Sequence, residues 1–150
     1  MALIADYLER LIVNTILVAV DGSPSSVQAA RAAVGFAHDH VSKLIVLAFS
    51  ERAEGAAVTE PAMHDDARDC AYQIGEYALK ARIPCEMDVL HSESPAEEIV
   101  AASRHRHCDL IWMPAASDKG RPYPFGAAVA TEVLGKADVP VMLFRSRTVA

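Results

Sequence analysis

The sequence predicts a doubly wound α/β domain, in which a parallel sheet lies between two layers of helices. Short runs rich in β-branched residues and leucine alternate along the chain with longer segments of helical period. Several of these runs are almost continuously apolar, as expected of strands that are covered on both faces. The 150 residues, 52% of them hydrophobic, are enough for one domain with a sizeable core.

Five of the apolar runs are expected to be strands. They are Thr15–Val20, Lys43–Phe49, Cys85–Leu90, 109–113 and 140–144. The third run alternates polar and apolar residues, which is typical of a strand at the edge of a sheet. Each connection between parallel strands needs a crossover, and the segments between the runs have the length and period of helices.

Four helices are expected between these strands, over residues 24–39, 61–81, 95–107 and 126–137. Ser23 precedes Pro24, which places an N-cap hydroxyl before a proline at the first helical position. Ser94 and Pro95 repeat this pattern, and Glu97 is expected to complete a capping box with Ser94. Both helices therefore have start signals with a physical basis.

Residues 1–13 are expected to form an amphipathic extension that precedes the domain, which spans residues 14–147. The apolar side chains on one helical face of the extension are Leu3, Ile4, Tyr7, Leu8, Leu11 and Ile12. We expect this stripe to dock on its own domain, and docking of a protein partner is the alternative. The segment lacks a basic beginning and its apolar run is interrupted by charges, so we expect neither a signal peptide nor a membrane anchor.

The charge and the cysteines restrict the partners and the compartment. A formal net charge of -6 makes an electrostatic interaction with nucleic acid or with an anionic membrane an unlikely main activity. Cys70, Cys85 and Cys108 are an odd number of cysteines and form no C-x-x-C motif. A reducing, cytoplasmic location follows as the natural interpretation.

Ligands of open α/β sheets bind beyond the carboxyl ends of the strands, which here means the segments after Val20, Phe49 and Met113. Asp21 ends the first strand, and Ser23 opens the next helix, whose N-terminus could accept an anion. The alternative is that Asp21 and the serines only form a turn and cap the helix. The sequence leaves both interpretations open.

Three segments, in this order and spacing, resemble the universal stress protein family. They read ILVAVDGSPSSVQAARAAV, SPAEEIVAASRHRHCDLIWM and VATEVLGKADVPVMLF, and the resemblance covers about residues 14–145. It implies a Rossmann-like α/β sandwich of the adenine nucleotide alpha-hydrolase-like kind, with five parallel strands in the order 3-2-1-4-5. It also implies a homodimer assembled through the C-terminal strand, Val139 to Phe144.

The nucleotide-binding branch of that family carries G-x-x-G, nine further residues and G-[ST] after the strand that ends in Met. The residues aligned with these four positions are Pro114, Ser117, Ala127 and Ala128. Proline lacks a backbone N–H to donate to a phosphate, and serine must adopt a backbone that glycine made easy. Gly126 lies one residue before the third position and could replace it after a local shift. The motif is degenerate, so we expect a protein that does not depend on ATP.

The residues expected on the adenine side of the implied site agree only partly with the family pattern. Asp21 matches the acid that the family places near the adenosine, and Val20, Met113 and Val129 are compatible with it. Phe49 could stack on a base or fill the cavity, and we favour filling because aromatic residues at strand ends are usually core. The candidate nucleotide-site positions are Val20, Asp21, Phe49, Met113, Pro114, Ser117, Gly126, Ala127, Ala128 and Val129.

The 114–128 loop also brings Lys119 and Arg121, which could meet an anion or could be solvated charges. No cofactor is certain, and ATP or AMP is possible through Asp21 and this loop. We expect a regulatory stress-response module and not an enzyme, with an atypical ATP- or AMP-binding member as the alternative and weak ATP hydrolysis as a third.

Other chemistries lack the required patterns. No G-x-S-x-G nucleophile elbow separates a strand from a helix, and Cys108 ends a helix instead of opening one. The pairs His38 and His40, and His105 and His107, are two residues apart, so on a helix the members of each pair point in different directions. We therefore expect no catalytic residue and no metal ligand.

Overall fold

The computed structural model describes residues 12–50, 66–115 and 127–145. Its elements, in chain order, are β1 (Thr15–Val20), α2 (Pro24–His40), β2 (Lys43–Phe49), α3 (Asp66–Lys80), β3 (Cys85–Leu90), α4 (Pro95–His105), β4 (Leu110–Pro114), α5 (Ala127–Lys136) and β5 (Val141–Phe144). The strands form one parallel sheet in the order β3-β2-β1-β4-β5. The predicted fold class and strand order are confirmed.

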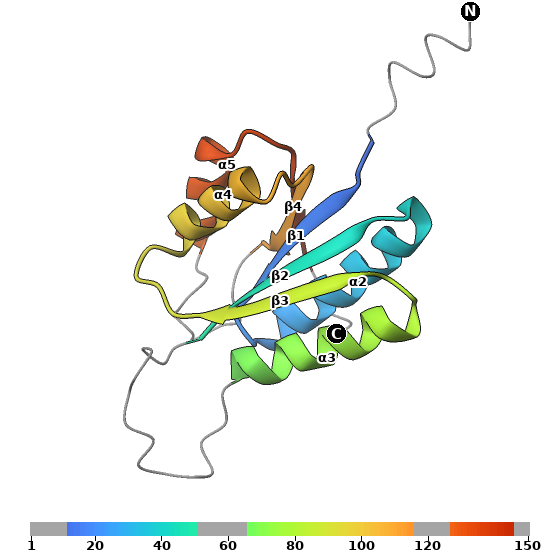
Figure 1. Cartoon of the computed structure of the whole chain (residues 1–150). Helices are drawn as coiled ribbons and strands as arrows, with labels where there is room; N and C mark the ends of the chain where they lie inside the picture. The colour runs from blue at the N-terminus through green and yellow to red at the C-terminus, as the bar shows by residue number, and fades with distance from the viewer. Residues whose placement is uncertain (1–11, 51–65, 116–126, 146–150) are drawn as a thin grey trace, which may run out of the picture.

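Helices cover both faces of the sheet, α2 and α3 on one face and α4 and α5 on the other (Figure 1). Consecutive strand residues point to opposite faces. Val18 and Val46 accordingly pack in the α2–α3 core, while Leu17 and Ile45 pack in the α4–α5 core. The central strands are buried on both sides, which explains their nearly continuous apolar sequence.

The last two strands differ by one residue from the sequence expectation. Asp109 precedes β4, and its Oδ2 accepts the backbone N–H groups of Asn14 (2.8 Å) and Thr15 (3.0 Å) at the start of β1. Pro114 belongs to β4 because it pairs with Phe144 at the sheet edge. A strand tolerates a proline at a position where the sheet does not need a hydrogen bond from its N–H.

The predicted cap of α2 is confirmed. Ser23 has an extended backbone, and its hydroxyl accepts the N–H of Ser26 at 3.2 Å. The predicted capping box of α4 is wrong, because the Ser94 side chain makes no cap hydrogen bond. The N–H of Ser94 donates to Ser92 Oγ at 3.0 Å, so it is already used and Glu97 does not close the box.

Two other helix ends differ from expectation or fall outside the structure. α4 ends at His105, earlier than expected, because His107 has a left-handed backbone (φ 52°) that stops the helix. α3 is described from Asp66, and its expected start over residues 61–65 lies outside the described residues.

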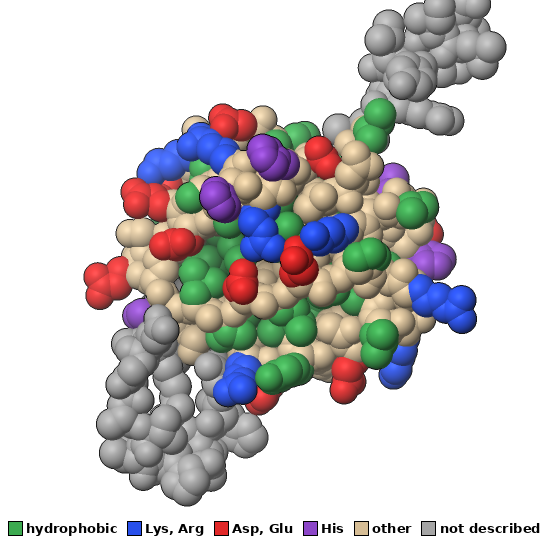
Figure 2. Space-filling view, viewed as in Figure 1, with side chains coloured by type: hydrophobic (Ala, Val, Ile, Leu, Met, Phe, Trp, Pro, Cys, Tyr) green, Lys and Arg blue, Asp and Glu red, His purple; other side chains and the backbone are tan. Residues whose placement is uncertain are grey.

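The edge strand β3 is exposed along most of its length, as the alternating sequence predicts. Lys43 Nζ lies 2.7 Å from Glu86 Oε2, and Arg106 contacts Glu86 at 2.9 Å and Asp88 at 3.4 Å. Hydrogen bonds from Lys43 and then Arg106 lower the pKa of Glu86. Figure 2 shows such basic and acidic side chains interspersed on this face, above a band of hydrophobic ones. Charges on an edge strand discourage pairing with another chain.

Candidate functional site

The carboxyl ends of β1, β2 and β4 lie side by side and carry five of the candidate site residues. These are Val20, Asp21, Phe49, Met113 and Pro114. Three of them, Val20, Phe49 and Met113, are fully buried. Val20 packs in the α2–α3 core, and Phe49 and Met113 pack in the α4–α5 core. The structure therefore brings the predicted residues to one edge of the sheet as packed side chains.

Asp21 lies at the centre of a hydrogen-bonded turn between β1 and α2. Asp21 is only 1% exposed. Its Oδ1 accepts the Ser26 hydroxyl at 2.5 Å and the N–H of Ser23 at 3.0 Å. Its own N–H donates to Ser26 Oγ at 2.9 Å. The carboxylate thus ties the end of β1 to the first turn of α2, where backbone N–H groups favour a negative charge.

Gly22 allows α3 to approach this turn closely. Its φ of +84° is one that side chains rarely adopt, and a Cβ built there would lie 2.5 Å from the carbonyl carbon of Asp66. The first residues of α3 therefore cover the turn that contains Asp21. Residues 51–65, between β2 and α3, lie outside the described part of the chain.

Cys70 is a buried residue near this turn that the sequence did not identify as a site residue. Burial and then the nearby Asp21 carboxylate raise the pKa of its thiol to about 12, against a weaker lowering by a hydrogen bond with the Gly22 backbone. Burial also raises the pKa of Cys108 to about 11. Both thiols are neutral at physiological pH, so neither is an activated nucleophile.

His91 is the second residue of this edge that the sequence did not identify. It follows β3, and its Nδ1 lies 2.9 Å from the carbonyl oxygen of Ser50, while the N–H of Ser50 donates to Leu90 at 2.7 Å. Its position directly after a strand was the signal that could have found it. It adds a titratable group to the edge beyond β2 and β3.

The part of the site between β4 and α5 is described only at its two ends. The N–H of Ala115 donates to the carbonyl of Phe144 at 2.9 Å, so the chain stays paired with β5 just beyond Pro114. α5 begins at Ala127, Ala128 is exposed, and Val129 packs partly against the α4–α5 core. Ser117, Lys119, Arg121 and Gly126 lie outside the described residues.

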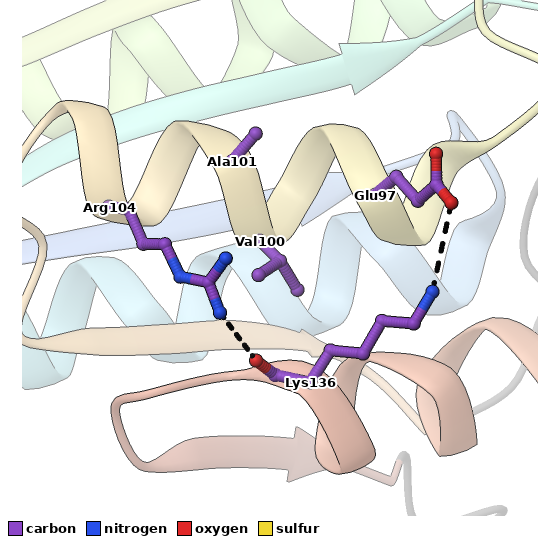
Figure 3. A pocket seen from close by; sticks show the side chains of 5 residues that line it. All are labelled: Glu97, Val100, Ala101, Arg104 and Lys136. Carbon is purple, nitrogen blue, oxygen red and sulfur yellow. Dashed lines mark hydrogen bonds and ion pairs between the residues drawn. The ribbon is translucent and has the colours of Figure 1, made fainter.

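A groove of about 360 Å³ lies between α4 and α5 and is lined by Glu97, Val100, Ala101, Arg104 and Lys136 (Figure 3). Arg104 donates to Asp138 at 2.5 Å and to the carbonyl of Lys136 at 3.0 Å. Lys136 lies 3.7 Å from Glu97 and 3.3 Å from Glu132. Three carboxylates surround these two cations, so the groove does not present the net positive charge that an anionic ligand needs.

The described residues contain neither a cluster suited to a metal ion nor a helix suited to spanning a membrane. Within them, no three or more His, Cys, Asp or Glu side chains gather as a metal ion would require. His38 and His40 lie in the last turn of α2, and His40 stacks on Phe36 with ring centroids 3.9 Å apart. Across the same residues, no helix has both the length and the apolar character needed to cross a membrane.

The universal stress protein family model matches residues 13–145. The chain therefore belongs to the universal stress protein family.

Solved structures of this family share the fold at low sequence identity. A family protein from Burkholderia pseudomallei has a TM-score of 0.65 at 20% identity, over 90% of this chain and 98% of that one. A universal stress protein in complex with cAMP gives 0.65 at 18% identity, over 91% and 99%. One from Archaeoglobus fulgidus in complex with dAMP gives 0.61 at 18% identity, over 89% and 98%. Some proteins with this fold thus bind adenine nucleotides.

Proposed function

We propose that this chain is a regulatory universal stress protein that acts as a cytoplasmic homodimer and does not depend on ATP. The carrying observation is the Asp21 turn. In this turn the candidate ligand-binding carboxylate is 1% exposed and accepts hydrogen bonds from Ser23 and Ser26. A nucleotide that bound through Oδ1 of this carboxylate would have to replace the hydrogen bonds that hold β1 to α2.

The end of β4 supports the same proposal. Pro114 stands where the nucleotide-binding motif has its first glycine, and it has no N–H to offer a phosphate. It is buried, and its strand remains paired with β5 at this point. Phe49 is fully buried in the neighbouring α4–α5 core, which favours the interpretation that it fills the cavity over the interpretation that it stacks on a base.

Calorimetric titration with ATP, ADP and AMP, together with thermal shift, tests this proposal. We expect no saturable binding at micromolar concentration, and saturable micromolar binding would overturn it. A single-turnover assay with ATP should likewise show no hydrolysis above the buffer rate.

The second candidate function is atypical binding of AMP or ATP, supported by the relatives that are described in complex with cAMP and dAMP. It would use Asp21 together with Gly126, Lys119 and Arg121. On this alternative Asp21→Ala abolishes binding, whereas Ser26→Ala, which disturbs the same turn but keeps the carboxylate, retains it. Equal affinity of the wild type and Asp21→Ala would reject the alternative.

Dimerisation is proposed through β5, the sheet edge opposite β3. Its sequence, VMLF, carries no charge, and Met142 is 41% exposed. β3 in contrast carries Glu86 and Asp88 at its edge. An uncharged apolar edge is free to pair with a second copy, whereas a charged edge is protected from pairing.

Two matched substitutions test this interface. Met142 in β5 and Met87 in β3 are both edge-strand methionines, 41% and 38% exposed. Light scattering of the wild type should give a dimer mass at micromolar concentration. Met142→Lys should give a monomer and Met87→Lys should remain a dimer. A monomeric wild type would reject the proposal.

A further inference from the structure

Three helices of this protein end in the same way. After α2, α3 and α4, one residue adopts a left-handed backbone, and the next residue is buried and donates its N–H to a carbonyl five residues earlier. The left-handed residues are Val41 (φ 54°), Arg82 (φ 59°) and His107 (φ 52°). The returning hydrogen bonds join Ser42 to Ala37, Ile83 to Ala78 and Cys108 to Ser103, each at 2.9 Å. This is the usual helix-ending motif, but with other residues in place of the customary glycine.

Val41 is the unusual member of this set. Arg82 and His107 are exposed polar residues, as expected at a helix end. Val41 is β-branched, a class for which the left-handed backbone is a genuine outlier, and it is also 90% exposed. The position thus combines conformational strain with an apolar side chain in water, although a polar residue or glycine would relieve both.

A groove of about 230 Å³ lies beside Val41, at the end of the sheet opposite the candidate nucleotide site. It is lined by Asn14, Ala37, His38, Val41, Ser42, Lys43, Ala81, Arg82, Ile83 and Pro84. His38, Lys43 and Arg82 are basic, and this lining includes no Asp or Glu. Asp39 lies 3.6 Å from His38, and Glu86 lies 2.7 Å from Lys43, just outside the lining. Among the described residues, Arg82 is the cation of this groove that has no ion-pair partner.

The chain enters the domain at this groove. Ser42, the neighbour of Val41, donates its hydroxyl to the carbonyl of Val13 at 2.6 Å, and the N–H of Lys43 donates to the carbonyl of Asn14 at 2.8 Å. Ile12, directly before this anchored pair, is 59% exposed. The chain before Ile12 therefore begins close to Val41 in space.

We propose that residues 2–12 of the same chain occupy this groove as an amphipathic helix and cover Val41. The sequence supplies an apolar stripe that ends at Leu11 and Ile12, next to the groove. A helix of this length spans about 16 Å, and the amino ends of β1 and β3 are two strand spacings, about 10 Å, apart. The segment carries two acids, Asp6 and Glu9, and one base, Arg10, and this excess of negative charge suits a groove lined by basic residues.

Hydrogen exchange of the full-length protein tests this docking. The amides of residues 4–11 should be protected at least about tenfold in the wild type, and Val41→Asp should remove that protection. His107→Asp is the matched control, because it puts the same residue at an exposed left-handed position of another helix end. Asp tolerates this backbone better than Val does, so Val41→Asp is not expected to impair folding. The control should leave the protection unchanged.

Thermal unfolding gives a second readout. If nothing covers Val41, then Val41→Asp should raise the Tm because it relieves the strain. If the segment covers it, Val41→Asp should lower the Tm by about 2–4 °C. Leu8→Asp should lower the Tm similarly, and the double variant should lose little more than either single variant, because both changes break the same contact.

Three results would overturn the proposal. One is exchange of residues 4–11 at the rate of an unstructured peptide in the wild type. Another is a higher Tm for Val41→Asp. The third is protection that disappears on dilution, which would show that the occupant belongs to a second copy of the chain.

Discussion

The two ends of the sheet hold their polar groups in opposite ways. At the carboxyl end, Asp21, Ser23 and Ser26 are at most 1% exposed and are hydrogen-bonded to one another. At the amino end, the ion pairs of Lys43 with Glu86 and of Arg104 with Asp138 are about half exposed. Buried charged hydrogen bonds contribute far more to stability than exposed ion pairs. The polar groups at the carboxyl end of β1 are thus engaged in hydrogen bonds within the protein itself.

The largest effect is expected from Phe49→Ala at the carboxyl end. The side chain is fully buried in the α4–α5 core, so its loss should cost about 3–5 kcal/mol in the free energy of unfolding. Phe36→Ala is the comparison, because Phe36 is only partly buried where it stacks on His40 and Trp112. It should cost less than half as much in urea denaturation. Equal losses of unfolding free energy for the two variants would contradict the difference in burial between the two ends of the sheet.

Asp21→Ala is expected to cost about 2–4 kcal/mol, because it leaves buried donors of Ser23 and Ser26 without an acceptor. Asp21→Asn keeps an acceptor oxygen and should lose clearly less. Urea denaturation at pH 7 measures both. A loss below about 0.5 kcal/mol for Asp21→Ala would show that the carboxylate is not structural and would favour a role in ligand binding.

Gly22→Ala should cost about 2 kcal/mol, because it combines a positive φ with a Cβ that would lie 2.5 Å from the Asp66 backbone. Gly35→Ala provides the control within α2. A Cβ at Gly35 meets nothing within 4 Å, so that variant should gain up to about 1 kcal/mol from helix propensity. Thermal and urea unfolding should therefore shift in opposite directions for the two glycines.

The smallest change is expected from Glu86→Gln at the amino end. Contacts with Lys43 and Arg106 lower the pKa of Glu86 in the folded protein. The resulting stability is present above the ordinary pKa of a glutamate and is lost as the pH falls through the lowered value. The variant should be slightly less stable than the wild type at pH 7, and this difference should shrink as the pH is lowered to 3. The same difference at both values would show that the charge of Glu86 is not the cause.

The strands and the first helix cap were predictable because their signals are local. β1, β2 and β3 have the expected bounds, since runs of β-branched and apolar residues depend only on neighbouring positions. Ser23 before Pro24 is similarly self-contained, and the cap forms as expected. At Ser94 the same signal failed, because Ser92, two residues earlier, competes for the N–H that the capping box requires.

The sequence predicted where the candidate site residues lie, but not whether their side chains are exposed. The ends of β1, β2 and β4 meet at one edge because the strands are parallel, and that follows from the pattern of the sequence. Whether Asp21 is open to a ligand depends on Ser26 and on the approach of α3 to Gly22, which sequence spacing does not reveal. Cys70 was missed for the same reason, whereas His91 was missed although its position directly after β3 was a signal that the sequence offered.

The sequence by itself determined the fold class, the strand order through its family resemblance, and which residues lie at the carboxyl edge. Only the tertiary structure decided which of them are exposed. Trp112 Nε1, for example, donates to the carbonyl of Ala29, 83 positions away, at 2.8 Å. The state of Asp21 and of Val41 likewise depends on neighbours that the fold supplies. The physical reason is that period and propensity are local properties, whereas burial is decided by what the rest of the chain packs against a residue.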